Sequence, residues 1–516
     1  MGSTAFDSNR LASDWLQHAA QQQPGASALV LQDASFDYAS LHSLTAQLCQ
    51  LLRSQGLKPG AIIVVESRSA ALLAFLLHAA LCADFVLLPL DPRLPDGQSN
   101  ELMEQTHADL ILSEDDAANL LAQAGQAQPI CAAKSLEALA RISHQSARIS
   151  RSRFIFTRDY LTERNTSVYF RGKKIPCGKK DQARSCRSGE KCGLDRPRLL
   201  IATSGSCGLP KLVKLSDSNL QASVHAANQR LKLSHTSVWL DCLPLVHIGG
   251  LSILLRCACA GASLVLHEGF DARSVVDDLH NHQVSHISLV PAMLAQLLEL
   301  AKQPPRSLQV VLVGGAPLEP SLAGRALAAG WPVWVTYGMT ETASMLAARK
   351  LGTGDDNPRQ VGSPLPGFEL RIVDEVIEVR GAAVHHSGNR YAGQWFSTGD
   401  RGQLDKAGRL TLMGRTDSML LSGGEKVYPE RVEQLLANCA GIDEVAVTGQ
   451  ADPVWGERVV AVYCGDIDAA ALAQLCRNGI EGVMRPRTFV KVESLPRTTN
   501  GKLDRAALRG LVADRL

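Results

Sequence analysis

The sequence predicts an α/β protein with a large N-terminal domain and a smaller C-terminal domain. The chain has 516 residues, too many for one ordinary hydrophobic core. Short apolar segments typical of buried strands alternate with segments of helical apolar spacing through most of its length. From Val361 onward the pattern changes to short strands and tight turns, and the last part of the chain carries helix and strand signals of its own.

The strand and helix signals follow one another in chain order. In the first part, strands are expected at 28–31, 61–65, 85–90 and 110–112, and helices at 41–52 and 70–82. Further on, strands are expected at 199–202, 238–243, 262–266, 286–290, 310–313 and 333–335, and helices at 219–231 and 272–280. A hairpin is expected at 370–373 and 376–380, and a last strand at 409–413. This alternation is typical of parallel sheets, which place ligands at the carboxyl ends of their strands.

The composition argues against several classes of protein. Hydrophobic residues make up 45% of the chain and charged residues 20%, as in globular proteins, and the net charge of +2 gives no argument for nucleic acid or a membrane surface. The longest apolar region, residues 70–90, is interrupted by His78, Asp84 and Pro89, which argues against a membrane span. No apolar export signal is found near the start, so we expect a cytoplasmic protein whose 13 cysteines are reduced.

Residues 145–195 interrupt the α/β pattern. They are rich in arginine, lysine and serine and have no apolar period, so we expect an atypical, basic, solvated insertion. The segment contains Cys177, Cys186 and Cys192, but these form no close pair of ligands and no histidine lies among them. A zinc site is therefore disfavoured.

A loop rich in glycine and hydroxyl residues follows the expected strand at 199–202. Consecutive backbone N–H groups in such a loop form a nest for anions, which hydroxyls and a lysine complete. The residues concerned are Thr203, Ser204, Gly205, Ser206, Gly208 and Lys211. The P-loop pattern G-x-x-x-x-G-K-[ST] is absent, and an ordinary loop remains the alternative when this stretch is taken alone.

Four later stretches carry side chains suited to nucleotide chemistry. Residues Tyr337–Thr342 offer an aromatic face for a purine and a carboxylate for Mg²⁺, which prefers oxygen ligands. The aspartate of Ser397–Asp400 can accept hydrogen bonds from ribose hydroxyls. The other two are Gly414–Asp417 with the following Ser422–Glu425, and Pro496–Lys502 near the end of the chain. Each of them alone is more typical of a structural turn or a solvated surface.

Together and in this order, the five stretches resemble the adenylate-forming superfamily of acyl- and aryl-CoA ligases, adenylation domains and luciferases. The resemblance runs from about Ala28 to the end of the chain, apart from the insertion. It implies a large N-terminal domain (1–414) of α/β layers with a distorted small β-barrel, and a small, mobile α+β domain (415–516). It also implies an enzyme that uses ATP and Mg²⁺ to convert a carboxylic acid to an acyl-adenylate, and then transfers the acyl group to CoA.

The resemblance assigns a role to each motif. The loop 203–211 would bind the ATP phosphates, Thr340 the α-phosphate and Glu341 the Mg²⁺ ion. Lys502 would bridge the carboxylate and the α-phosphate during adenylation, which creates a negatively charged pentavalent centre. The adenosine-binding residues would be Tyr337, Gly338, Asp400 and Arg415; the hinge would be Asp417, and the pantetheine tunnel would be lined by Gly423 and Gly424.

Residues Leu243–Ser252 resemble the acyl-pocket motif of the superfamily, and are most similar to the o-succinylbenzoate–CoA ligases of menaquinone synthesis. By this resemblance His247 would be a catalytic and substrate-binding residue, and Gly314 would bind substrate. Arg256 would meet a free carboxylate of the substrate. An arginine on an apolar helix needs an anionic partner when it is buried, and the alternative is a guanidinium that reaches solvent.

Several alternatives stay open at this point. The chain could be a CoA ligase for another aromatic acid, a β-keto-type acid or a fatty acid, or a stand-alone adenylation enzyme that loads a carrier protein. A degenerate homologue that only binds nucleotide is disfavoured by Glu341, Asp400 and Lys502. Cys207 stands where the family usually has threonine, and a thiol is a weaker donor. The expected partners are the small-molecule acid, ATP and CoA, with no nucleic acid and no membrane span; the sequence does not determine the oligomeric state.

Overall fold

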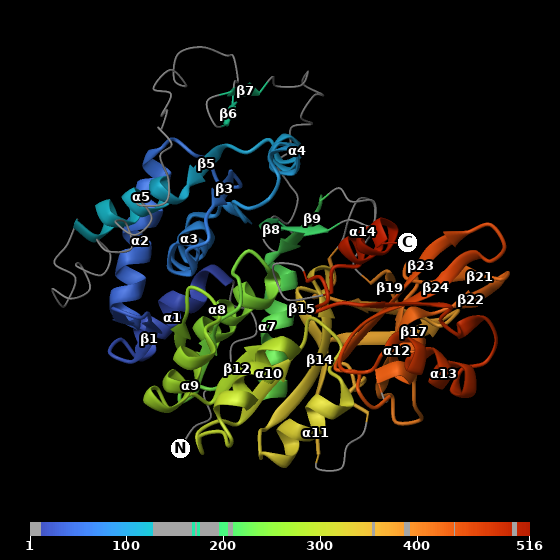
Figure 1. Cartoon of the computed structure of the whole chain (residues 1–516). Helices are drawn as coiled ribbons and strands as arrows, with labels where there is room; N and C mark the ends of the chain where they lie inside the picture. Colours follow the sequence, from blue (N-terminus) through green and yellow to red (C-terminus); the bar gives the residue numbers. More distant parts are fainter. Residues whose placement is uncertain are drawn as a thin grey trace.

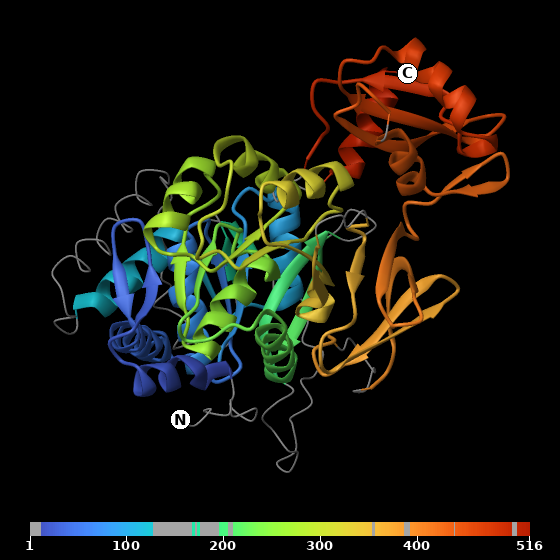
Figure 2. The same ribbon diagram turned by 90° about the horizontal axis from the view of Figure 1, so that it is seen from below.

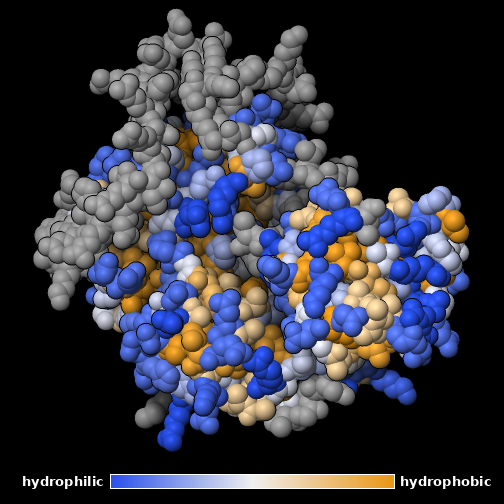
Figure 3. Space-filling view, viewed as in Figure 1, coloured by the Kyte–Doolittle hydropathy of each residue, from blue (hydrophilic) through white to orange (hydrophobic). Residues whose placement is uncertain are grey.

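The computed structural model consists of a large N-terminal α/β domain and a small C-terminal α+β domain, so the predicted fold class is confirmed (Figures 1 and 2). The structure describes residues 12–126, 168–170, 173–175, 196–204, 210–352, 357–385, 393–437, 439–497 and 503–515. Within these ranges no helix is both long and apolar enough to cross a lipid bilayer. Hydrophilic side chains surround the hydrophobic ones on the face that Figure 3 shows.

An eight-stranded sheet forms the centre of the N-terminal domain. Its strands, in spatial order, are β15 (Ser344–Lys350), β14 (Val333–Met339), β13 (Val310–Val313), β12 (His286–Leu289), β10 (Val238–Asp241), β11 (Ser263–Leu266), β1 (Ser27–Val30) and β2 (Ser35–Asp37). The strands from β14 to β1 are parallel, and the two outer strands are antiparallel to their neighbours. Its helices are α7 (Asp217–Leu231), α8 (Ile248–Ala260), α9 (Ala272–Asn281), α10 (Pro291–Leu300) and α11 (Pro320–Ala328).

A second sheet has five strands in the order β5 (Leu110–Ser113), β3 (Ile62–Glu66), β4 (Val86–Leu90), β8 (Pro197–Ser204) and β9 (Pro210–Ser216). The helices of this region are α1 (Trp15–Gln22), α2 (Tyr38–Ser54), α3 (Ala70–Ala83), α4 (Asp96–Thr106) and α5 (Glu114–Gln126), after the short 3₁₀ helix η1 (Ala12–Asp14). Because strand side chains alternate, Ile63 and Val65 join the main core while Val64 packs with Leu102 and Met103 of α4. Both faces of this sheet are therefore covered.

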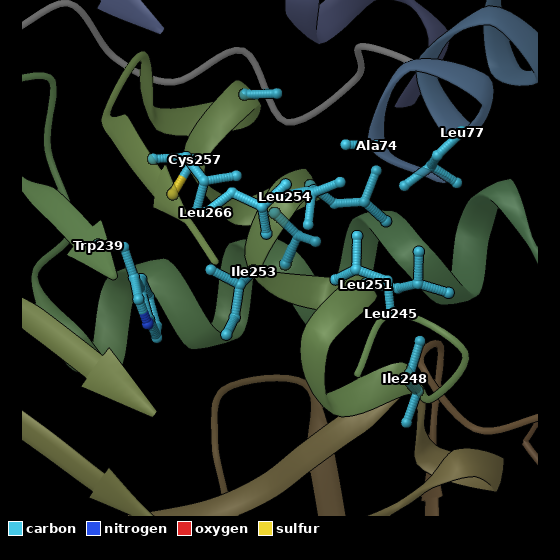
Figure 4. Close-up of a cluster of buried hydrophobic side chains, with 14 of the residues drawn as sticks. Ala74, Leu77, Trp239, Leu245, Ile248, Leu251, Ile253, Leu254, Cys257 and Leu266 are labelled. Carbon is cyan, nitrogen blue, oxygen red and sulfur yellow. The ribbon is translucent and has the colours of Figure 1, made fainter. Parts of the chain in front are cut away.

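Helix α8 is buried almost all round and connects the two halves of the core. Figure 4 shows its apolar side chains between Ala74 and Leu77 of α3 and the strand residue Trp239. The first turn of α8 packs closely against the loop of residues 244–247. A Cβ on Gly250 would lie only 2.9 Å from the Pro244 carbonyl oxygen. Any larger residue would push the start of α8 away from the loop that precedes it.

A third, antiparallel sheet contains β16 (Gln360–Gly362), β20 (Leu410–Arg415), β19 (Phe396–Leu404), β18 (Val376–Gly381) and β17 (Phe368–Val373). It occupies the part of the sequence where short strands and tight turns are expected. Its strands β19 and β20 carry two of the predicted site residues, and its register pairs Asp400 with Arg415.

The C-terminal domain has a sheet of β22 (Glu425–Val427), β21 (Leu420–Ser422), β24 (Gly456–Cys464), β23 (Glu444–Asp452) and β25 (Thr488–Lys491). Its helices are α12 (Pro429–Ala437), α13 (Ala469–Gly479) and α14 (Arg505–Arg515), with a 3₁₀ turn η4 (Gly482–Met484). Among the described residues, the last buried hydrophobic residue that clusters with the N-terminal domain is Leu410. The first one that clusters with the C-terminal domain is Leu420. The two domains therefore have separate hydrophobic cores.

Most of the expected elements are present, and several were missed. Elements that were not predicted from the sequence include α1, α4, α5, α10, α11, β2, β9 and β15. The expected insertion at 145–195 lies outside the described residues, except for a two-stranded hairpin of β6 (Val168–Phe170) and β7 (Lys173–Ile175). Cys177, Cys186 and Cys192 lie outside them as well.

Candidate active site

The predicted phosphate loop is the end of an antiparallel hairpin. Strands β8 and β9 pair Thr203 with Lys211 and Ser204 with Pro210. The Thr203 hydroxyl donates to the Lys211 carbonyl oxygen (3.2 Å), and the Lys211 side chain is 57% exposed. The lysine thus lies on the return strand and not on the loop itself. Gly205, Ser206, Cys207 and Gly208 lie outside the described residues.

A tight turn follows β14 and carries Thr340 and Glu341. This turn is the 3₁₀ helix η3 (Thr340–Thr342), and the Thr342 hydroxyl accepts a hydrogen bond from the Met339 N–H (3.0 Å). A bulge between Tyr337 and Gly338 lets β15 return beside the turn. A Cβ on Gly338 would lie 2.1 Å from the Ser344 carbonyl oxygen, so only glycine permits this return.

The hairpin and the turn bring opposite charges together. The Nζ of Lys211 lies 3.9 Å from Oε1 of Glu341, whose side chain is 13% exposed. An ammonium group can bind phosphate oxygens, and a carboxylate is the hard oxygen ligand that Mg²⁺ prefers. The donor set at this point therefore fits a magnesium–phosphate group, with Thr203 and Thr340 on the two elements concerned.

His385 links the hairpin to the turn and was not predicted as a site residue. Its backbone N–H donates to the Glu341 carbonyl oxygen (2.6 Å), and its Nδ1 donates to the Lys214 carbonyl oxygen of β9 (2.7 Å). The side chain of Asn219 donates to the carbonyl oxygens of Ala382 and Val384 and so holds the same segment. A lone histidine outside any motif gives no signal in the sequence, and its position depends on the tertiary fold.

Tyr337, Asp400 and Arg415 form one hydrogen-bonded group. The Tyr337 hydroxyl donates to Oδ2 of Asp400 (2.6 Å), and Nη1 of Arg415 donates to Oδ1 (3.1 Å). Burial raises the pKa of Asp400, although both partners oppose this shift. Burial, together with the neighbouring Asp400, also raises the pKa of Tyr337. The tyrosine and the arginine thus stabilise the ionised form of a carboxylate that is only 17% exposed.

The predicted hinge residue continues this group. Asp417 accepts two hydrogen bonds of 2.8 Å from Arg415, which lowers the pKa of Asp417. The next residue, Ser418, donates to Oε1 of Glu430 on α12 (2.7 Å), and Glu430 forms an ion pair with Arg505 (3.2 Å). A chain of polar contacts therefore runs from the proposed ribose-binding carboxylate into the C-terminal domain.

Gly423 and Gly424 form the two-residue turn between β21 and β22. Both have positive φ values, +59° and +82°, as in the hairpin turns that match strand twist. The Gly423 N–H donates to the Trp455 carbonyl oxygen, and a Cβ on this residue would lie 3.1 Å from the Trp455 ring. Turn geometry alone requires these glycines, so their identity does not depend on a bound ligand.

Arg256 lies on α8 and is 1% exposed. Its Nη2 donates to the Ser344 hydroxyl (3.1 Å), just after the turn that carries Glu341, and its guanidinium lies 5.6 Å from the Trp239 ring centroid. Burial lowers its pKa to about 10, so it stays charged at neutral pH. Its Nε has no hydrogen-bond partner among the described residues.

The carboxyl group of Asp241 lies near this arginine, and its charge favours the charged form of the guanidinium. Asp241 is fully buried, and burial raises its pKa well above the ordinary value, whereas the charge of Arg256 opposes this shift. One of its oxygens accepts a hydrogen bond from the Leu243 N–H, and the other has no partner among the described residues. Arg256 is thus a buried guanidinium whose Nε–H group has no hydrogen-bond partner among the described residues, which is the setting that an anionic ligand would complete.

The other predicted substrate residues lie at the ends of neighbouring elements. His247 is the residue before α8 and is half-buried. Gly314 follows β13, and a Cβ there would lie 2.6 Å from the Thr336 methyl group. Lys502 lies outside the described residues. Its neighbours are placed, because Arg497 pairs with Leu503 and the Asp504 N–H donates to the Pro496 carbonyl oxygen (2.8 Å).

Known families match both domains. The AMP-binding enzyme family matches residues 16–385, and the AMP-binding enzyme C-terminal domain matches residues 431–502. The first match alone covers more than half of the chain. The chain therefore belongs to the AMP-binding enzyme family.

Within this family, the chain is similar to 2-succinylbenzoate–CoA ligases. The ligase of Bacillus pumilus is 28% identical over 96% of this chain and 97% of its own length. That of Bacillus velezensis is 33% identical over 62% of this chain and 69% of its own length. The structure of o-succinylbenzoate CoA synthetase (MenE) from Bacillus subtilis in complex with the acyl-adenylate intermediate OSB-AMP is similar with a TM-score of 0.76, at 25% identity over 98% of both chains.

Proposed function

We propose that this chain is an ATP-dependent 2-succinylbenzoate–CoA ligase, which forms an acyl-adenylate and then a CoA thioester. One observation carries the proposal: ligases of this name match the chain over nearly its whole length and nearly the whole of theirs. The reaction belongs to the AMP-forming acid–thiol ligases, with ATP, Mg²⁺ and CoA as cofactor and co-substrates.

The geometry supports specific roles in the adenylation half-reaction. In this proposal Lys211 and the hairpin would bind the phosphates, Thr340 would meet the α-phosphate, and Glu341 would hold Mg²⁺. The bound ion supplies charge neutralisation on the phosphate oxygens. Asp400 would accept hydrogen bonds from the ribose hydroxyls in its ionised form, which Tyr337 and Arg415 stabilise. Lys502 would approach the same α-phosphate from the C-terminal domain.

The acid would be held beside α8. Arg256 carries a positive charge at neutral pH, and its Nε–H group has no partner within the described part of the chain, so it would bind the carboxylate that is not activated. His247 and Gly314 would line the pocket for the rest of the acid. Arg256 contacts Ser344, which is two residues after the turn residue Thr342, and this link supports a pocket that ends close to the Glu341 site.

The domain boundary and the hinge are part of the same proposal. We place the boundary between residues 414 and 415, and Asp417 would be the hinge about which the C-terminal domain turns. The separation of the hydrophobic cores between Leu410 and Leu420 supports this placement. After the turn, Gly423 and Gly424 would line the path of the pantetheine thiol. The expected setting of this chemistry is the cytoplasm, where ATP and CoA are found.

The proposal is tested by pyrophosphate release over a panel of carboxylic acids, with and without CoA. The expected result is the highest kcat/KM for 2-succinylbenzoate, with a thioester formed only when CoA is present. A higher kcat/KM for a fatty acid or a monocarboxylic aromatic acid would refute the substrate. Pyrophosphate release that no CoA-thioester follows would point to a carrier protein as the acceptor.

A further inference from the structure

Two contacts hold the start of helix α12 against the strand pair β19–β20. The register of these strands pairs Arg401 with Gly414. The guanidinium carbon of Arg401 lies 3.4 Å from the centroid of the Tyr428 ring. A Cβ on Gly414 would lie 2.7 Å from Oε2 of Glu430, so the absence of a side chain there lets the helix approach. Tyr428 and Glu430 flank the first residue of α12, and both contacts therefore hold the same point of the C-terminal domain.

Arg401 reaches Tyr428 because of its place on β19. Successive side chains of a strand point to opposite faces, so Asp400 lies toward Tyr337 while Arg401 lies toward the C-terminal domain. Arg401 is 6% exposed, and its Nη2 donates to Oε2 of Glu375 (2.8 Å). A cation over an aromatic ring is attracted most strongly where water is excluded. Arg401 is thus fixed by its own domain and presents a buried cation to a ring of the other domain.

Glu430 connects the same point to the chain just after the proposed hinge. Its Oε1 accepts a hydrogen bond from the Ser418 hydroxyl (2.7 Å). Arg401 and Gly414 precede the proposed hinge residue Asp417 in the sequence, and Ser418 follows it. The start of α12 is therefore attached to residues on both sides of the hinge. A rotation of the domain about Asp417 has to break the contacts with Arg401 and Gly414.

In the arrangement that these contacts hold, the glycine turn between β21 and β22 faces its own domain. The nearest atoms to a Cβ on Gly423 would belong to Trp455 and Val483, both in the C-terminal domain, and a Cβ on Gly424 would meet no atom within 4 Å. In the proposed reaction this turn lines the path of the pantetheine thiol toward the acyl-adenylate. The domain therefore has to leave this arrangement before CoA reacts.

We propose that Arg401 and Tyr428 are positioning residues, which hold the C-terminal domain in the arrangement for adenylation and separate before the CoA thiol attacks. This inference rests on the proposed function, because it assigns the observed arrangement to the first of the two half-reactions. Both residues act through the position of the domain and not through contact with the substrate. Loss of their contact should therefore slow the first half-reaction and leave the second unchanged or faster.

The kinetic test measures the two half-reactions separately, in rapid-quench experiments with the full-length protein, ATP and 2-succinylbenzoate. Arg401→Met and Tyr428→Leu should each slow acyl-adenylate formation about 2- to 30-fold, which is the range for the loss of one cation–π contact. The attack of CoA on acyl-adenylate that has already formed should be unchanged or faster. Tyr428→Phe keeps the ring and should retain the wild-type rates. The Arg401→Met/Tyr428→Leu double variant should lose little more than either single variant, because both remove the same contact.

Arg371→Met is the matched control. Arg371 forms the same kinds of contact inside the N-terminal domain, because its guanidinium carbon lies 4.3 Å from the Trp395 ring centroid and its Nη2 lies 2.6 Å from Oε2 of Glu378. Both half-reactions should keep the wild-type rates in this variant. The proposal is overturned if Arg401→Met slows both half-reactions equally, or if Tyr428→Phe slows adenylation as much as Tyr428→Leu does.

A second measurement needs no substrate, so it separates a failure of this inference from a failure of the proposed function. The Thr416 N–H donates to the Gly399 carbonyl oxygen (2.9 Å), and hydrogen–deuterium exchange in peptides that contain residues 414–420 reports the opening of the hinge. This exchange should be about 2- to 30-fold faster in Arg401→Met and Tyr428→Leu, and unchanged in Tyr428→Phe and the matched control. Wild-type exchange in the first two variants would overturn the proposal. A rise spread over the whole chain would show only a loss of stability and would overturn it as well.

Discussion

Replacing Tyr337 with phenylalanine should move the acid limb of ATP utilisation to higher pH. The substitution removes one short hydrogen bond, 2.6 Å long, from the hydroxyl to the buried Asp400 carboxylate. Such a bond to a charged group contributes about 1.5–3 kcal/mol, and about 1.4 kcal/mol corresponds to one pH unit. Because the bond stabilises the ionised carboxylate, its loss favours the protonated form, which cannot accept both ribose hydrogen bonds.

The assay is pyrophosphate release at limiting ATP between about pH 5 and pH 8. The acid limb of kcat/KM for ATP should rise by about one pH unit or more in Tyr337→Phe, with a smaller loss of activity above the limb. Asp400→Asn should abolish this limb, since the amide does not ionise. Tyr428→Phe is the control, because the centroid of that ring lies 3.4 Å from the guanidinium carbon of Arg401, and among the described residues its hydroxyl forms no hydrogen bond to Asp400. An unchanged limb, or a limb at lower pH, in Tyr337→Phe would refute the role of this hydrogen bond.

Three further substitutions test other parts of the site. Arg256→Met should raise KM for 2-succinylbenzoate about 10- to 100-fold, because a charge-assisted hydrogen bond is lost. KM for the analogue that lacks the second carboxylate should change little. Equal effects on both acids would show that Arg256 does not bind the second carboxylate. In a denaturant titration, Gly338→Ala should lower the free energy of unfolding by about 1–3 kcal/mol, because its Cβ would overlap the Ser344 carbonyl oxygen. The control Gly324→Ala places a Cβ where no atom lies within 4 Å, so it should leave this free energy unchanged or raise it. Lys502→Ala should slow acyl-adenylate formation at least about 100-fold and leave the melting temperature unchanged. The control Lys491→Ala should not slow acyl-adenylate formation. Normal adenylation by the Lys502 variant would contradict the catalytic role of this lysine.

The sequence predicts those parts of the fold that depend on local pattern. Buried strands such as β13 and β14 follow from apolar runs, and the helices α2, α3 and α7 follow from apolar spacing. Strand β9 was missed because it follows a loop with two glycines and a proline. Its signal is the alternation of Val213 and Leu215, both fully buried, around the lysine at position 214.

The candidate site is predictable as a set of motifs and not as a geometry. The pairing of Tyr337, Asp400 and Arg415 depends on a β-bulge and on the register of two strands, which residue types alone do not define. The contact of Arg256 with Ser344 joins residues 88 positions apart and requires the rotation of α8 to be known. His385 contributes through one backbone and one side-chain hydrogen bond, neither of which leaves a pattern in the sequence.

The most direct test of the proposed reaction is an oxygen-transfer measurement with 2-succinylbenzoate labelled with ¹⁸O in its carboxylates. Attack of a carboxylate on the α-phosphorus places one substrate oxygen between the acyl carbon and AMP, and the thiolate of CoA then displaces AMP together with that oxygen. Mass spectrometry should therefore find AMP with a single ¹⁸O atom, in equal amounts with unlabelled pyrophosphate and the CoA thioester. Unlabelled AMP, or ADP and phosphate in place of AMP and pyrophosphate, would contradict the acyl-adenylate route.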